Sequence, residues 1–155
     1  VLFRSVGPGC PNLIERIESG LLSFGGDMGY DTTPFECGLD KYVSLDADIE
    51  SLSLDELRTR KSKTKLIGIV IDRKVNLIDK RVFIGSNVVG KITSDTWSPR
   101  YSAFLAFAKC ELKHLEDAQN LHVKTTSGEV SAWITDLPFD FETLGLTGIE
   151  KGTSI

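Results

Sequence analysis

The stretch that decides the fold is Leu66-Ile67-Gly68-Ile69-Val70-Ile71, where every residue except the glycine is apolar and most are β-branched. A short apolar run without helical periodicity is typical of a strand that is buried on both faces. The character of the sequence changes at Lys63, because turn-rich segments precede it and apolar runs follow it. The run therefore predicts that a β domain begins near residue 63.

Candidate strands continue downstream at a regular spacing. Hairpin-type connections, Gly85-Ser86-Asn87 and Thr126-Ser127-Gly128, separate two of the pairs. Short strands at this spacing predict an antiparallel β-barrel or a jelly-roll-like sandwich. The candidate strands cover residues 81–84, 88–93, 103–110, 121–126 and 129–137. The side chains that we expect in the core are Ile67, Ile69, Ile71, Phe104, Phe107 and Ile134.

The residues before the β domain predict short helices, a loop and one strand. A helix is expected over residues 11–22, because proline suits its first position and apolar residues recur with helical spacing. A turn-rich loop follows, and then residues 39–45 are a candidate strand. A second helix, residues 53–61, is expected to open with a capping box formed by Ser53 and Glu56.

The fold class is therefore α+β, and the chain divides into three parts. A mixed segment covers residues 6–62, the β domain covers residues 63–140, and residues 141–155 form a tail. Residues 1–5 match the translation of adapter-like DNA, so we interpret them as a cloning scar.

Composition and charge exclude several classes of protein. Among 155 residues, 41% are hydrophobic and 26% are charged, which indicates a folded chain. The net charge of −4 argues against a nucleic-acid partner, and no apolar run reaches the roughly 18 residues that a membrane helix needs. Cys10, Cys37 and Cys110 form no CxxC pair, and no histidine lies at ligand spacing from them, so no metal site is predicted. Reduced thiols of this kind fit a cytoplasmic protein.

Catalytic signatures that can be read from one sequence are absent: there is no GxSxG, P-loop, HExxH or dinucleotide fingerprint. Four other segments follow one another along the chain. They are R-I-E-S-G-L-L-S-F-G-G-D-M at residues 16–28, T-P-F-E-C-G-L at 33–39, V-G-K-I-T-S-D-T-W-S-P at 89–99 and L-P-F at 137–139. In this order they resemble the aminomethyltransferase family, the T-protein of the glycine cleavage system.

The resemblance implies an architecture and a chemistry. Residues 6–62 would be the C-terminal remnant of a folate-binding α+β domain, and residues 63–140 the C-terminal β-barrel. Tetrahydrofolate would be the cofactor, a small molecule would donate the one-carbon group, and the partner would be a missing N-terminal part of the same chain; a homo-oligomer stays open. The catalytic residues are unknown, because similar proteins carry the pterin-binding carboxylates upstream.

The residues of two segments favour one branch of this family. C-P-N-L-I-E-R-I-E at residues 10–18 and E-C-G-L-D-K-Y at 36–42 are similar to dimethylsulfoniopropionate demethylase, which moves a methyl group from a sulfonium to tetrahydrofolate. The T-protein has an arginine where this chain has Asn12, and an asparagine brings no charge. We therefore predict methyl transfer from dimethylsulfoniopropionate, and we expect this chain alone to be inactive.

Two alternatives remain open. One is an aminomethyltransferase of the glycine cleavage system, which would act with a lipoyl-carrying partner. The other is a non-catalytic folate-binding relative. Such relatives usually carry the motif K-G-C-Y-x-G-Q-E, which this sequence lacks.

Three residues are predicted to contact folate, each with a structural alternative. Asn12 matches the arginine position of the T-protein but could instead cap a helix. Glu36 could line the site or brace its loop. Trp97 could close over the folate or pack as a half-buried aromatic side chain.

Three further motif residues are interpreted as structural. Arg16 and Glu18 are expected to pair with neighbouring residues or with the next domain, because polar groups on a packed helix need partners. Asp27 is interpreted as a turn former, since aspartate folds back onto its own backbone. Asn12, Glu36 and Trp97 are thus the only residues of these segments that the sequence assigns to the site.

Overall fold

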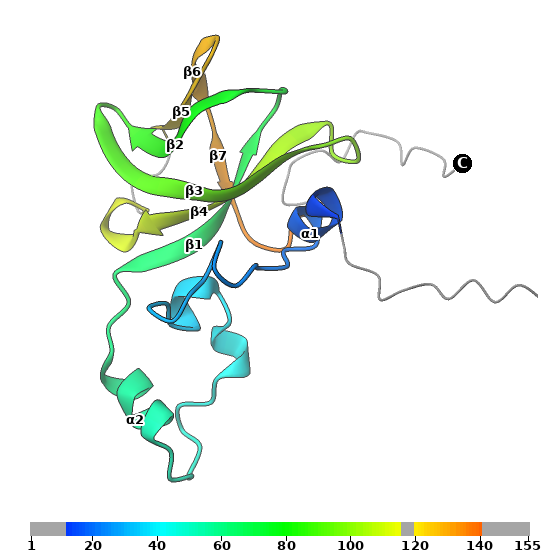
Figure 1. Ribbon diagram of the computed structural model, residues 1–155. Coiled ribbons are helices and arrows are strands. Elements are labelled where there is room, and N and C mark those ends of the chain that lie inside the picture. The colour runs from blue at the N-terminus through cyan, green and yellow to red at the C-terminus, as the bar shows by residue number, and fades with distance from the viewer. Residues whose placement is uncertain (1–11, 116–119, 141–155) are drawn as a thin grey trace, which may run out of the picture.

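The computed structural model describes residues 12–115 and 120–140, which form an antiparallel sheet preceded by short helices (Figure 1). Hydrogen bonding orders the sheet as β6-β5-β2-β3-β4-β1-β7, and each neighbouring pair is antiparallel. The predicted antiparallel β-barrel is therefore confirmed. The strands are β1 (Thr64–Ile71), β2 (Leu77–Ile84), β3 (Asn87–Ser98), β4 (Ala103–Glu111), β5 (Leu121–Thr125), β6 (Gly128–Ser131) and β7 (Trp133–Thr135).

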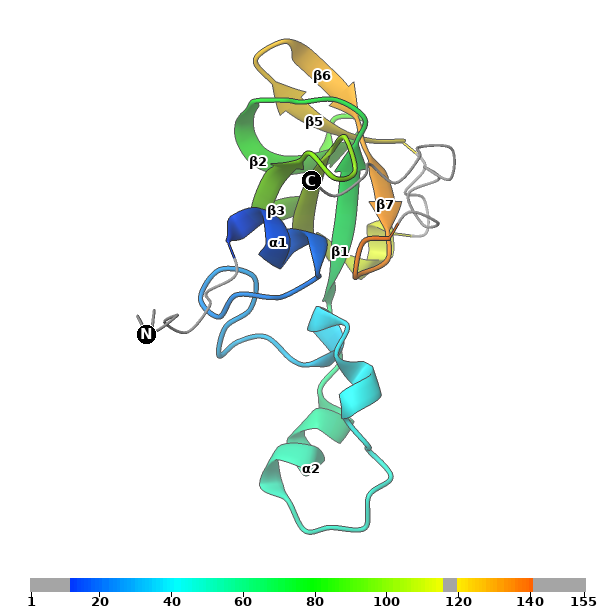
Figure 2. The same ribbon diagram turned by 90° about the vertical axis from the view of Figure 1, so that its right-hand side faces the viewer.

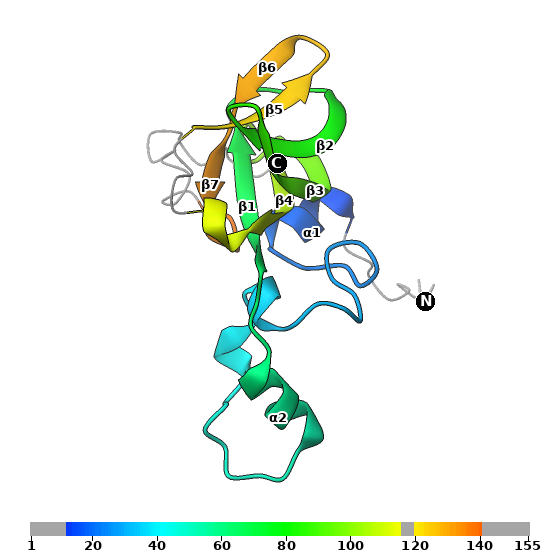
Figure 3. The same cartoon turned by 90° about the vertical axis from the view of Figure 1, so that its left-hand side faces the viewer.

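One residue joins the two edges of the sheet. Strand β6 ends at Ser131 on one edge and β7 begins at Trp133 on the other, so only Ala132 lies between them. Because one residue spans only about 3.5 Å, the edges lie close together and the sheet must curl, as Figures 2 and 3 show. The single strand predicted over residues 129–137 is wrong in its extent, because the chain changes edges at Ala132.

Strand β1 is buried on both faces, as its sequence predicts. Ile67, Ile69 and Ile71 pack into the core of the curled sheet. Leu66 and Val70 face the other way and belong to a second apolar cluster on the outer face, together with Ile17, Tyr101, Ala103, Leu105, Phe107 and Phe139. Of the core residues expected from sequence, only Ile134 is half-buried, because it lies on the edge strand β7.

Helix α1 (Leu13–Glu18) is shorter than the helix predicted over residues 11–22. Gly20 has a φ of +68°, and the N–H of Leu21 donates to the carbonyl of Arg16 at 2.9 Å. This is the usual helix-ending arrangement around a left-handed glycine. Leu21, which was expected on the apolar face of the helix, therefore lies beyond it and is exposed.

The segment between α1 and the sheet contains the turns η1 (Phe35–Cys37) and η2 (Asp40–Tyr42). The strand predicted over residues 39–45 is wrong. The N–H of Tyr42 donates to the carbonyl of Leu39 at 3.0 Å, so local turn bonds take the place of a strand partner.

Helix α2 (Leu52–Thr59) lies at the far end of this segment, away from the sheet (Figure 3). Its N-cap is Ser51, which makes no side-chain capping bond, so the capping box predicted for Ser53 and Glu56 is wrong. A third short turn, η3 (Leu112–His114), follows β4. Across residues 12–115 and 120–140, no helix is both long and apolar enough to cross a membrane.

Candidate functional site

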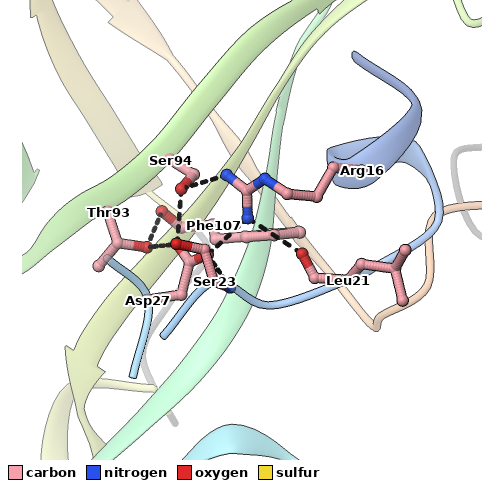
Figure 4. Close-up of polar contacts among 7 residues, drawn as sticks. All are labelled: Arg16, Leu21, Ser23, Asp27, Thr93, Ser94 and Phe107. Atoms are coloured by element: carbon pink, nitrogen blue, oxygen red, sulfur yellow. Dashed lines mark hydrogen bonds and ion pairs between the residues drawn. The ribbon is translucent and has the colours of Figure 1, made fainter. Parts of the chain in front are cut away.

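Motif residues that are far apart in sequence meet on the outer face of β3 (Figure 4). Arg16 of α1 holds Asp27 by an ion pair of 2.7 Å between Nη1 and Oδ2. The same guanidinium donates through Nη2 to the hydroxyl of Ser94 at 2.7 Å and lies over the Phe107 ring, 5.8 Å from its centroid. With Thr93, these residues form what we call the anchor cluster: Arg16, Asp27, Thr93 and Ser94.

Asp27 is the centre of the anchor cluster. Its Oδ1 accepts hydrogen bonds from Thr93 at 2.6 Å and Ser94 at 2.7 Å, and its Oδ2 accepts from the backbone N–H of Ser23 at 2.9 Å. Burial would raise the pKa of Asp27, but these bonds and the Arg16 guanidinium outweigh it and hold that pKa below its ordinary value. A carboxylate that is stabilised as an anion in this way is a weak base. The contacts of Asp27 tie α1 and its loop to the sheet.

The free energy of unfolding should therefore contain a contribution from Asp27 that disappears in acid. Because the folded pKa lies below the ordinary 3.8, this contribution is present above that value and is lost as the pH falls through the folded pKa. Urea denaturation from about pH 5 to about pH 2 measures it. The Asp27→Asn variant should show a shallower loss of stability than the wild type.

Asp31→Asn is the matched control, because Asp31 is an exposed carboxylate of the same loop. This control should keep the wild-type pH dependence. Identical pH profiles for Asp27→Asn and the wild type would contradict the role of Asp27.

A second link joins α1 to the end of β3. Ser98 is fully buried, donates its hydroxyl to Glu18 at 2.5 Å and accepts from the N–H of Tyr101 at 3.1 Å. The Tyr101 hydroxyl in turn donates to the carbonyl of Phe139 at 3.0 Å. The motifs at residues 16–28, 89–99 and 137–139 therefore meet at this link. The interpretation of Arg16 and Glu18 as partners of the next domain agrees with both links.

Glu36 makes contacts that brace its loop. Its Oε2 accepts from the N–H of Thr33 at 3.0 Å, and its Oε1 accepts from the Thr64 hydroxyl at 2.7 Å at the start of β1. Burial would raise the pKa of Glu36, but the hydrogen bonds from Thr33 and Thr64 and the nearby Lys109 lower it overall. Both carboxylate oxygens are thus engaged inside the chain, and the predicted folate contact of Glu36 stays a prediction.

Asn12 is the N-cap of α1. Its Oδ1 accepts from the N–H of Glu15 at 2.9 Å, and the Glu15 carboxylate accepts from the N–H of Asn12 at 3.4 Å. The structural alternative for Asn12 is therefore realised. Asn12 is exposed, and its amide NH₂ makes no hydrogen bond with the described residues, so a folate contact through that group stays a prediction.

Trp97 lies in β3 rather than in a loop, and it is half-buried against the core of the curled sheet. That core is on the face opposite to the anchor cluster, since Phe107 and α1 pack on the outer face. The three predicted folate contacts come from α1, η1 and β3. Among the described residues no hydrogen bond or ring contact joins any two of them.

The sequence reading of Asp27 missed its main partners. A turn explains its bond to Ser23 but not its bonds to Thr93 and Ser94, which lie more than 60 positions away. The Thr93-Ser94 pair in the motif at residues 89–99 could have indicated these partners, because two adjacent hydroxyl donors suit a buried carboxylate.

An apolar face lies beside these links. Five large apolar or aromatic side chains of residues 13–42 are at least half exposed: Leu13, Leu21, Phe24, Tyr30 and Tyr42. Leu21 and Tyr42 line a hollow of about 440 Å³ together with Gly20, Leu22, Met28, Leu39 and Pro138. Phe24 and Tyr30 meet edge to face, with 5.0 Å between their ring centroids. Exposed apolar side chains that line a hollow are typical of a surface that contacts another body of protein or a ligand. We call these five side chains and the hollow the apolar face.

Comparison with known proteins agrees with these observations. The family model described as the glycine cleavage T-protein C-terminal barrel domain matches residues 64–140. Aminomethyltransferase T from Bartonella henselae shares the fold with a TM-score of 0.65 and 17% identity, over 83% of this chain and 37% of that one. The antiparallel barrel of residues 64–140 thus has the architecture of the C-terminal barrel domain of the glycine cleavage T-protein family.

Sequence relatives lie in the same family. A dimethylsulfoniopropionate demethylase from Ruegeria pomeroyi is 32% identical over 127 residues, which are 80% of this chain and 35% of that protein. An aminomethyltransferase from Listeria welshimeri is 31% identical over 128 residues, with the same two coverages. The chain belongs to the glycine cleavage T-protein family. It spans about a third of the length of these curated relatives.

Proposed function

We propose that this chain is the C-terminal part of a tetrahydrofolate-dependent one-carbon transferase that demethylates dimethylsulfoniopropionate. The observation that carries the proposal is the apolar face beside the anchor cluster. The cluster fixes α1 and its loop on the barrel, while Leu13, Leu21 and Phe24 remain exposed. Because the relatives are about three times longer, the occupant that we assign to this face is an N-terminal part of the same chain.

The residues described here do not form a complete folate site. Both carboxylate oxygens of Glu36 accept hydrogen bonds, from Thr33 and Thr64, and Trp97 packs against the core. Of the three predicted contacts, Asn12 is the exposed one, and its amide NH₂ donors have no partner among the described residues. The proposal therefore gives this chain one contact to the folate at most and leaves the rest, including the catalytic groups, to the N-terminal part.

The sulfonium chemistry needs little from these residues beyond rigidity. A sulfonium is an activated methyl donor, because its leaving group departs as a neutral thioether. Holding the reacting atoms in line can supply roughly 7–11 kcal/mol of the barrier reduction. A loop fixed at one end by Asp27 and at the other by Glu36 is suited to that positioning.

Aminomethyl transfer is the second candidate, because aminomethyltransferases are nearly as similar to this chain as the demethylase is. Asn12 favours demethylation, since the arginine of the T-protein would place a cation near a cationic sulfonium. The two activities can be separated by their one-carbon donors.

The test uses the reading frame that encodes this chain, recovered with the sequence upstream of it. The purified product should form methyl-tetrahydrofolate from dimethylsulfoniopropionate, and the present chain alone should form none above a no-enzyme control. Turnover only with an aminomethyl-loaded lipoyl carrier would support the second candidate instead. Folate binding without either turnover would indicate the non-catalytic relative, and no folate binding would refute all three functions.

Variants at position 12 separate the folate contact from the helix cap. Asn12→Ala should lower stability by about 1 kcal/mol, because the capping bond to Glu15 is lost, and should weaken folate binding by roughly 5- to 30-fold if the contact exists. Asn12→Ser keeps a capping oxygen, so it should restore stability but not folate affinity. Asn12→Arg should reduce sulfonium turnover more than folate binding, because like charges repel. Equal folate affinity in all variants would remove Asn12 from the site.

A further inference from the structure

A row of three cations crosses the outer face of the sheet, on the side that carries α1. The strand register pairs Arg81 with Lys91 and Lys91 with Lys109, so the three side chains leave the sheet on one face. The next residue in the row is Leu66, which belongs to the outer cluster with Ile17. The row therefore lies on the same face as α1.

This arrangement is unfavourable for the chain on its own. Like charges directly opposite one another in neighbouring strands destabilise a sheet. Arg81 is paired with Asp79 at 2.7 Å, but neither Lys91 nor Lys109 has an ion-pair partner among residues 12–115 and 120–140. Buried Glu36 attracts Lys109 at longer range. The chain as a whole is acidic, with a net charge of −4, so the row opposes its average charge.

The three cations line one hollow of about 500 Å³. Lys80, which is paired with Asp95 at 2.8 Å, also lines the hollow, and the hydrophobic lining residues are Val88 and Val89. A hollow of this volume falls within the usual range for small-molecule sites. Its single acidic lining residue among those described, Glu111, is already paired with Lys113 at 2.6 Å.

We propose that this hollow binds a small polyanion, a molecule with two or more phosphate or carboxylate groups, through Lys91 and Lys109. The anion relieves the repulsion between Lys91 and Lys109. Arg81 and Lys80 line the same hollow, but each is already paired, with Asp79 and Asp95 respectively. The site is independent of the proposed one-carbon transfer, because none of its residues is a predicted folate contact. Its test therefore does not depend on that function.

The test measures the melting temperature of the 155-residue chain at low salt with pyrophosphate or citrate, against sodium chloride of equal ionic strength. Either polyanion should raise the melting temperature in a saturable manner, whereas chloride should not. A rise with pyrophosphate alone assigns phosphate groups to the ligand, and a rise with citrate alone assigns carboxylates. The absence of a rise with both would overturn the proposal.

Lys91→Gln is the informative variant, and Lys74→Gln is its control. Lys74 is an exposed lysine between β1 and β2 that does not line the hollow. Without anion, Lys91→Gln should melt at or above the wild-type temperature, because it removes repulsion. With anion its affinity should be about tenfold weaker, since a charge-assisted contact is lost, while Lys74→Gln should bind as the wild type does. Equal weakening in both variants would mean a general charge effect and would overturn the site.

Discussion

Replacing Phe107 with alanine is expected to lower the free energy of unfolding by about 3–5 kcal/mol, the usual cost of deleting a buried aromatic side chain. Phe107 is fully buried on the outer face of β4 and stacks on Phe139 at 6.1 Å between ring centroids. It also supports the Arg16 guanidinium. Loss of the ring would therefore leave a cavity and loosen the contact between α1 and the sheet. Urea denaturation of the purified chain measures the effect.

Phe24→Ala is the matched control for this variant. Phe24 is 60% exposed, and its ring contacts only Tyr30 edge to face among the described aromatic residues. Its substitution should change stability by less than about 0.5 kcal/mol, as surface changes usually do. If Phe107→Ala were no more destabilising than Phe24→Ala, the outer cluster would not be a core.

Asp27→Ala should cost about 3–5 kcal/mol, because removing one partner of a buried ion pair leaves the other charge uncompensated. The Asp27 side chain has no exposed area, and the Arg16 side chain is 17% exposed. The variant also leaves the hydroxyls of Thr93 and Ser94 without their acceptor. Equilibrium denaturation is again the measurement.

Asp31→Ala serves as the control for Asp27→Ala, because it removes an exposed carboxylate four positions along the same loop. Its effect should stay within about 0.5 kcal/mol. Equal losses for the two variants would show that the anchor cluster contributes no special stability. A large loss for Asp27→Ala alone supports the cluster as the joint between the loop and the barrel.

The strands were predictable because their signal is local. The run at residues 66–71 has no helical period and lies between polar segments, and β1 is indeed buried on both faces. Strand β4 is almost continuously apolar for the same reason. The break at Ala132 was not predictable, because it depends on which edge each half of the segment joins.

The errors before the barrel have a common cause. Residues 39–45 have the apolar content of a strand, but no neighbouring strand offers hydrogen bonds to them, and a local turn forms instead. Helix α1 ends at Glu18, just before the left-handed Gly20, although apolar spacing continues to Leu21, because backbone conformation decides helix ends. Apolar periodicity reports neither of these constraints.

The site residues were harder to predict than the strands. The motifs identified residues that matter, but their partners lie far away in sequence: Ser94 for Arg16, Ser98 for Glu18 and Thr64 for Glu36. A motif indicates which side chains are used together only after the fold brings them together. The helix cap of Asn12 and the bracing role of Glu36 were available as alternatives because they are local, whereas the distant partner of Glu36, Thr64, was not.

The single residue between β6 and β7 also affects how copies of this chain can meet. Edge strands are templates onto which another chain can add a strand. Here the outermost strands are only four and three residues long, and Ala132 folds them toward each other. An incoming strand would find few free backbone groups there. Strand addition between copies at these two edges would therefore be disfavoured, and so would amyloid-type growth from them.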